Sequence, residues 1–174
     1  MKRPSWITAV GIIAIILGVL GIMGGAGNML TPTVIELQQE MFSSMQEMME
    51  NEPDAPVGLF RVFERFLDMP PWVGTWYVVT GVLKLLASGF VILAAAYLLQ
   101  VKKQAPLLFY AACGSRLLVA VLELVPVFSG SLWGYSTLSN AFLGIVAFGA
   151  LLLVAATSDK RAFAPSAPAP QTEN

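Results

Sequence analysis

The chain contains no histidine and a single cysteine, Cys113. Without histidine it lacks the commonest metal ligand and the usual proton shuttle near neutral pH. A serine or cysteine nucleophile would lack its customary base, and one cysteine cannot form an intrachain disulfide. No phosphate-binding glycine loop, CxxC pair, HExxH motif or nucleophile elbow occurs. These absences predict a protein that is not an enzyme and needs no cofactor.

Charged residues are scarce, at 12% of the 174 residues, whereas 56% are hydrophobic. A soluble domain carries roughly a quarter of charged residues because its surface faces water. Half of that fraction indicates that much of this protein's surface faces lipid. No basic stripe suited to nucleic acid is present, so the lipid bilayer is the first predicted partner.

Four apolar stretches are long enough to cross a bilayer, since a helix needs about 20 largely apolar residues to span about 30 Å of hydrocarbon. They cover residues 5–27, 72–99, 105–128 and 131–157. Backbone amides in lipid must be satisfied within the segment, so these runs predict helices rather than strands. The expected fold is an all-α integral membrane protein, a four-transmembrane-helix bundle that forms one domain over residues 1–161. The Ala- and Pro-rich segment 162–174 is predicted to be a disordered cytoplasmic tail.

Lysine and arginine are distributed unevenly between the connections. Pairs of cations precede the first span, separate the second from the third and follow the fourth: Lys2 and Arg3, Lys102 and Lys103, and Lys160 and Arg161. An even number of crossings separates these places, so all six cations lie on one face. Because cytoplasmic loops are enriched in Lys and Arg, both termini are predicted to be cytoplasmic and the acidic connection 31–70 extracytoplasmic. We expect a multi-pass protein of the plasma membrane, in a bacterium the inner membrane.

The first span has a second interpretation. Its basic start, apolar run and small residues at 24–27 also resemble a cleaved signal peptide, although the run exceeds the usual apolar region of a signal. Cleavage would leave three spans and would place the termini on opposite faces of the membrane.

The connection 31–70 is long enough to contain structure of its own. Apolar residues recur at helical spacing in its first part, at Val34, Leu37, Met41, Met45 and Met48. Thr33 followed by Glu36 forms a capping-box pattern, which predicts that a separate helix begins here. A second amphipathic stretch covers residues 59–68. One or two amphipathic helices are therefore expected to lie on the membrane surface or to cap the outer mouth of the bundle.

Four methionines lie on adjoining parts of the first of these helices, at Met41, Met45, Met48 and Met49. Thioethers are soft ligands that suit Cu(I), so extracytoplasmic copper binding is one hypothesis. Methionine is also a flexible apolar filler suited to adaptable binding surfaces, and no histidine or cysteine stands nearby. The spacing favours a packing or partner-docking face.

Ionisable residues inside the predicted spans are the most informative feature, because a charge in mid-bilayer is unfavourable unless it is paired or hydrated. Lys84, Arg116 and Glu123 fall at similar depths when the second and third helices are aligned about their connection. Asn140 on the fourth helix reaches the same level. Glu123 can accept a hydrogen bond from Lys84, from Arg116, or from both through water. We call these four residues the polar layer.

The polar layer has two explanations. A buried ion pair can fix which helix packs on which. Alternatively, the layer lines a functional cavity for an anionic ligand, a proton or an ion. One carboxylate against two cations leaves an excess positive charge, which water, an anion or loss of the Lys84 proton would relieve. On the first helix, the same depth falls near Gly18 and Gly21.

The leading functional hypothesis is a non-enzymatic accessory or scaffold protein. It would bind a membrane-protein partner, or a second copy of itself, through its outer helices or its lipid-facing surface. The hypothesis rests on the compact bundle, the Met-rich outer segment and the lack of any reaction motif. The alternatives are a small transporter or channel that uses the polar layer, and extracytoplasmic Cu(I) binding by the methionines.

Overall fold

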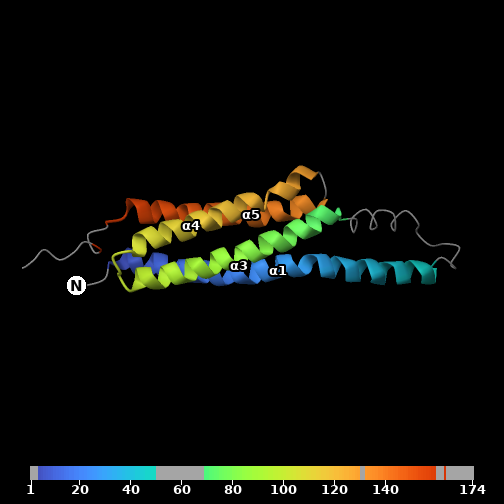
Figure 1. Cartoon of the computed structure of the whole chain (residues 1–174), viewed down its shortest axis with the longest axis horizontal. Helices are drawn as coiled ribbons and strands as arrows, with labels where there is room; N and C mark the ends of the chain where they lie inside the picture. Colours follow the sequence, from blue (N-terminus) through green and yellow to red (C-terminus); the bar gives the residue numbers. More distant parts are fainter. Residues whose placement is uncertain (1–3, 50–68, 130–131, 160–162, 164–174) are drawn as a thin grey trace, which may run out of the picture.

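A computed structural model describes residues 4–49, 69–129, 132–159 and 163, and these residues form helices and turns but no strand. In chain order the elements are α1 (Ser5–Met49), α3 (Pro71–Leu99), α4 (Ala105–Leu122), the 3-10 helix η1 (Val125–Ser129) and α5 (Leu132–Thr157). The long helices run along one axis of an elongated bundle (Figure 1). Four helical segments are long and apolar enough to cross a membrane, Ser5–Met45, Pro71–Leu99, Ala105–Phe128 and Thr137–Thr157. The prediction of four apolar helices is therefore confirmed.

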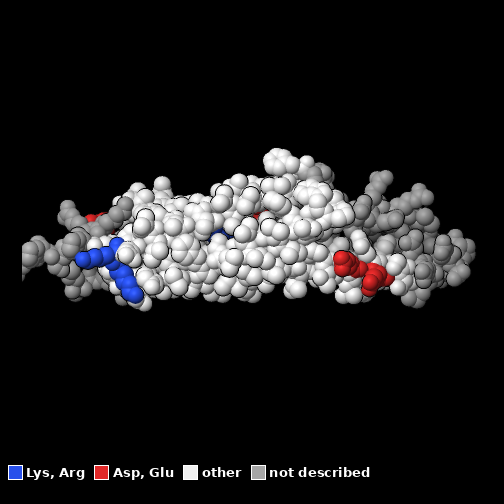
Figure 2. All heavy atoms as spheres, viewed as in Figure 1, with Lys and Arg blue, Asp and Glu red and all other residues white. Residues whose placement is uncertain are grey.

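On the face shown in Figure 2, the charged side chains of the described residues lie mainly at the two ends of the bundle, and only small charged patches show between them. The start of α1, the α3–α4 connection and the end of α5 lie together at one end (Figure 1). Lys102 and Lys103 in that connection are exposed, as are Glu36 and Glu40 on the part of α1 that reaches the opposite end. The chain thus alternates in direction as the sequence predicts. The four predicted terminal cations lie outside the described residues.

Side chains are distributed as in a bundle that is surrounded by lipid. Large aliphatic side chains point outward along every helix and are between 53% and 68% exposed in the examples Ile16, Leu86, Leu118 and Leu143. The buried positions are largely small or polar, and include the charged members of the polar layer. Helices in lipid associate through close packing at small residues and through interhelical hydrogen bonds, since lipid is as apolar as the helix surface.

Helix α1 is one continuous helix of 45 residues where the sequence predicts two. Thr33 lies inside this helix, so the prediction that Thr33 caps a new helix is wrong. Pro32 also lies inside it, and a Cβ atom built on Gly74 of α3 would lie 3.7 Å from the Pro32 ring. A proline removes one hydrogen bond from a helix interior, and this packing against α3 helps to offset the loss.

The continuity of α1 changes the position of residues 33–49. At 1.5 Å per residue the helix is about 67 Å long, roughly twice the hydrocarbon thickness of about 30 Å. Its last part projects along the bundle axis beyond the other helices (Figure 1). The expectation that this segment lies on the membrane surface or caps the bundle is therefore not confirmed. The second expected amphipathic stretch, 59–68, lies outside the described residues.

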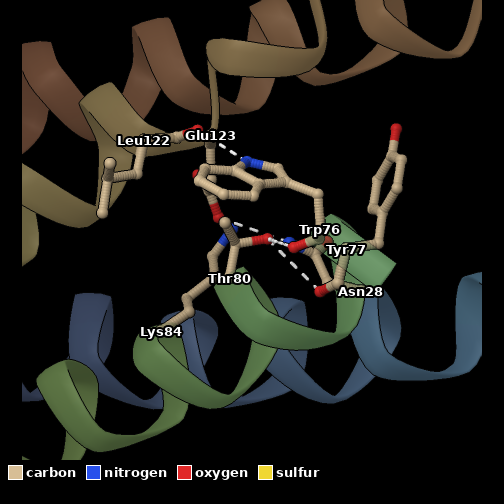
Figure 3. Close-up of polar contacts among 7 residues, drawn as sticks. All are labelled: Asn28, Trp76, Tyr77, Thr80, Lys84, Leu122 and Glu123. Carbon is tan, nitrogen blue, oxygen red and sulfur yellow. Dashed lines mark hydrogen bonds and ion pairs between the residues drawn. The ribbon is translucent and has the colours of Figure 1, made fainter. Parts of the chain in front are cut away.

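Helix α4 ends at Leu122, six residues before the predicted end of the third span at 128. Pro126 explains the early end, because it has no amide hydrogen and its ring clashes with the carbonyl four residues earlier, which is that of Leu122. The chain continues as η1. The indole Nε1 of Trp76 on α3 donates to the Leu122 carbonyl oxygen at 3.0 Å (Figure 3). Glu123 therefore occupies the C-cap of α4 rather than a position in mid-helix.

The helices pack in chain order, α1 on α3, α3 on α4 and α4 on α5, whereas α1 and α5 barely touch. The closest approach of α1 and α3 uses glycines, since a Cβ atom built on Gly81 would lie 2.8 Å from the Gly25 carbonyl oxygen. At the end where α1 begins, Trp6 packs edge-on against Phe163 with 6.2 Å between ring centroids. Phe163 is only 9% exposed, so this residue of the expected disordered tail is packed. The rest of the tail lies outside the described residues.

Replacing Gly81 with Ala tests the α1–α3 contact. The new methyl group would overlap the Gly25 carbonyl, so we expect the free energy of unfolding to fall by about 1–3 kcal/mol. Gly89→Ala on the same helix is the matched control, because nothing lies within 4 Å of the added atom. That variant should be stabilised by roughly 0.5–1 kcal/mol through its lower conformational entropy when unfolded. Unfolding of the purified protein in mixed micelles measures both changes in free energy. Equal changes for Gly81→Ala and Gly89→Ala would contradict the close contact at Gly81.

Candidate functional site

An ion pair between α3 and the end of α4 forms the centre of the polar layer. Lys84 Nζ lies 2.7 Å from Glu123 Oε1, and the two side chains are 8% and 3% exposed. Figure 3 shows Lys84 and Glu123 pointing toward each other between the green α3 and the end of α4. The predicted contact between these residues is present. Because both charges are withdrawn from water and lipid, each depends on the other for compensation.

Helix α1 contributes Asn28, a residue that the sequence does not assign to the site. Its Nδ2 donates to Glu123 Oε1 at 3.3 Å. The predicted first span ends near residue 27, which would leave Asn28 outside the membrane. Asn28 nevertheless shares a helix face with Gly21 and Gly24 at spacings of seven and four residues. A Cβ atom on Gly24 would lie 3.4 Å from Lys84 Nζ, so this face covers the ion pair.

Arg116 is buried but takes no part in that ion pair. It is 4% exposed, and its Nε and Nη1 atoms lack a hydrogen-bond partner among the described residues. Its guanidinium carbon lies 5.4 Å from the centroid of the Phe148 ring on α5, a cation–π contact. A Cβ atom on Gly21 would lie 3.6 Å from Arg116 Nε, which agrees with the predicted depth of Gly21. Of the alternatives that the sequence leaves open for Glu123, the direct contact is with Lys84, and no direct bond to Arg116 is formed.

Asn140, the fourth predicted member, is exposed on α5. In the described part of the chain it makes no hydrogen bond to Lys84, Arg116 or Glu123. Its predicted depth agrees with the structure, because Asn140, Lys84 and Arg116 line the same cavity. The side-chain amide that donates to Glu123 is that of Asn28.

That cavity is one part of a groove between α1 and α5, at the seam where these two helices barely touch. It has a volume of about 550 Å³ and contains Lys84, Arg116, Asn28 and Asn140 in its wall. Most of its remaining wall is small or apolar, with Gly21, Gly24 and Gly27 on α1 and Gly144 and Ala147 on α5. We call it the cationic half of the α1–α5 groove.

A second cavity of about 490 Å³ continues the groove toward the start of α1. The two cavities share Leu17 on α1 and Ala147 on α5. All its lining residues are apolar apart from the indole nitrogen of Trp6, and it lies between Trp6–Leu17 of α1 and Ala147–Val154 of α5. We call it the apolar half of the groove.

The methionine face lies far from this groove, on the projecting part of α1. Met41 and Met45 are 64% and 48% exposed. The side chains of Met48 and Met49 are outside the described residues, so the predicted four-methionine cluster is described only in part.

The two halves of the groove differ in charge, because the cationic half is lined by Lys84 and Arg116 whereas no charged residue lines the apolar half. Lys84, Arg116 and Glu123 together leave one uncompensated positive charge in the cationic half. An ion that passed this level would then meet the apolar half, where no charged side chain is available. A charge in such surroundings is strongly disfavoured. The arrangement therefore favours binding over conduction along this groove.

Replacing Lys84 with Met tests the buried ion pair. Glu123 would be left without its cation, and we expect a loss of about 3–5 kcal/mol of unfolding free energy. Adding Glu123→Leu to Lys84→Met should recover part of that loss, because the unpaired carboxylate is then removed. Lys103→Met, at an exposed position, should change stability by less than about 0.5 kcal/mol. Unfolding in mixed micelles measures these stabilities. If Lys84→Met were as stable as the Lys103→Met control, the buried ion pair would not stabilise the fold.

No protein-family model, curated protein or solved structure matches this chain. We therefore base the functional conclusion on the geometry and the charge of the groove.

Proposed function

We propose that this chain is a non-enzymatic membrane protein that binds an anionic molecule from the bilayer in the α1–α5 groove. Arg116 is the recognising cation. The single observation that supports this most strongly is a buried guanidinium with two unpartnered nitrogen atoms beside a cavity that it helps to line.

A purely structural role accounts for Lys84 and Glu123 but not for Arg116. The ion pair and the Asn28 hydrogen bond, both made to Glu123 Oε1, hold α1, α3 and α4 together, while Glu123 Oε2 has no hydrogen-bond partner among the described residues. Arg116 contributes no comparable bond to the bundle, and an unpaired buried charge is destabilising. An anion in the cationic half would supply both the missing charge and the missing hydrogen-bond acceptors. Charge-assisted bonds of this kind are stronger than neutral ones.

The positive-inside distribution of Lys and Arg supports an orientation with both termini in the cytoplasm. In that orientation the projecting part of α1 is extracytoplasmic, and the cationic half of the groove opens toward the outer leaflet. For a bacterial chain the membrane would be the inner membrane.

Arg116→Gln separates binding from stability. We expect the ligand-free protein to remain as stable as the wild type, or to become more stable, because an unpaired buried charge is removed. Binding of anionic lipids should weaken by about ten- to a hundredfold, the equivalent of one hydrogen bond to a charged group. Native mass spectrometry of protein extracted in neutral detergent measures the bound lipid, with Lys103→Gln as the control. A folded Arg116→Gln protein that retains the wild-type amount of anionic lipid would overturn the proposal.

A second candidate function is docking of a partner protein on the projecting part of α1, as an accessory or scaffold protein would do. Four apolar side chains form one stripe on this part of the helix, and they are 48% to 64% exposed: Val34, Leu37, Met41 and Met45. Glu36 and Glu40 flank the stripe and are exposed. A second copy of the chain would bring like charges together, so the stripe favours a different protein with an apolar helix and basic flanking residues.

Photocrosslinking from the projecting helix tests this docking surface. A photoreactive side chain at position 41 should give an adduct of one defined mass in native membranes. The same group at Ser43, which is exposed on another face of the helix, should not. The combination Glu36→Gln and Glu40→Gln should weaken the adduct because it removes the flanking charges. Equal labelling from positions 41 and 43 would exclude the stripe as a specific interface.

A further inference from the structure

The two halves of the α1–α5 groove are contiguous and differ in chemistry. One is apolar along its lining, and the other contains Arg116 and Lys84. Both are bounded by α1 and α5, and they meet at Leu17 and Ala147. A molecule that fills the whole groove must therefore have one charged end and one hydrocarbon end.

We propose that the ligand is an anionic amphiphile with one extended hydrocarbon chain, an inference that rests on the proposed anion binding at Arg116. Its head group, a phosphate or a carboxylate, lies against Arg116 in the cationic half. Its chain lies in the apolar half and points toward Trp6.

The length of the apolar half agrees with this class of ligand. From Leu17 to Trp6 the α1 wall rises about 16 Å at 1.5 Å per residue. One leaflet of a hydrocarbon core of about 30 Å has nearly the same thickness, so the groove accommodates one lipid chain along its length.

Charge in the cationic half favours an anionic head group over a neutral or cationic one. Arg116 and Lys84 outnumber Glu123, whose Oε1 is bound by Lys84 and Asn28 and whose Oε2 has no partner among the described residues. The Nε and Nη1 atoms of Arg116 are buried and have no hydrogen-bond partner among the described residues, so a head group in the cationic half would supply the acceptors that they lack. Guanidinium groups bind phosphate and carboxylate oxygens with two parallel hydrogen bonds, which suits either head group.

The direction of the groove indicates which leaflet supplies the ligand. The chain points toward the end of the bundle with Lys102 and Lys103, and the head group toward the end with Glu36 and Glu40. An amphiphile in the leaflet at the Glu36 end already has this polarity, so it need not turn over. It must also move along the groove by about one leaflet thickness, about 15 Å, to bring its head group to Arg116 and its chain alongside Leu17–Trp6.

The test uses the full chain in neutral detergent and follows binding by native mass spectrometry. The probes are hexyl, decyl and tetradecyl phosphate, with tetradecanol as the uncharged probe of equal chain length. Ala150→Phe narrows the apolar half, which Ala150 lines. Ala156→Phe is the matched control, since Ala156 is exposed on the same helix and does not line either half of the groove.

We expect tetradecyl phosphate to bind the wild-type protein at least about tenfold more tightly than hexyl phosphate or tetradecanol, a difference well resolved by titration. Ala150→Phe should remove the chain-length dependence and leave hexyl phosphate binding unchanged, whereas Ala156→Phe should bind as the wild type does. Arg116→Gln should weaken all three phosphates to a similar extent.

The possible failures are distinguishable. If the phosphates bind through Arg116 with no dependence on chain length, the proposed function stands and the amphiphile is wrong. If tetradecanol binds as tightly as tetradecyl phosphate, the groove takes hydrocarbon and anion recognition at Arg116 is wrong. If no probe binds, both proposals fail.

Discussion

A buried pair of opposite charges, Lys84 and Glu123, is the interaction on which the arrangement of the first three helices depends. In a medium without water each charge requires a partner of opposite sign, and the packing of α3 against the end of α4 brings these two to 2.7 Å. Asn28 adds α1 to the same contact. Pro126 contributes to this arrangement, because it ends α4 at Leu122 and so places Glu123 at the turn that follows the helix. Trp76 then satisfies the carbonyl oxygen released there.

The fourth helix is not held by this pair, and the groove follows from that difference. Helix α5 packs on α4 and hardly touches α1. If α5 packed directly on α1, it would cover the face of α1 that carries Gly21 and Gly24. Arg116 lies beneath this seam against Phe148 and makes no ion pair among the described residues. The excess positive charge of the polar layer therefore lies at the open seam between α1 and α5.

The depth of a residue along its helix predicts only part of the polar layer. Counting residues from the α3–α4 connection placed Lys84, Arg116 and Glu123 at similar depths, and Gly18 and Gly21 near the same depth on the first helix. In the structure Lys84 contacts Glu123, and a Cβ atom on Gly21 would lie near Arg116. The count could not decide between Lys84 and Arg116 as the partner of Glu123, because depth fixes height along the bundle but not direction around it. Asn28 was missed because the first span was predicted to end near residue 27. A signal existed in its spacing from Gly21 and Gly24.

The sequence by itself determined the number of apolar helices, the approximate start of each and the depth of the charged residues. These properties depend on hydropathy, chain length and rise per residue, all of which are local. Tertiary structure decided that α1 continues through Pro32, that Glu123 binds Lys84 rather than Arg116, and that the seam between α1 and α5 stays open. Each of these depends on contacts between helices that are distant in the chain, such as that of Pro32 with Gly74. The energies of such contacts are comparable to the local conformational preferences that they oppose, such as the tendency of proline to end a helix.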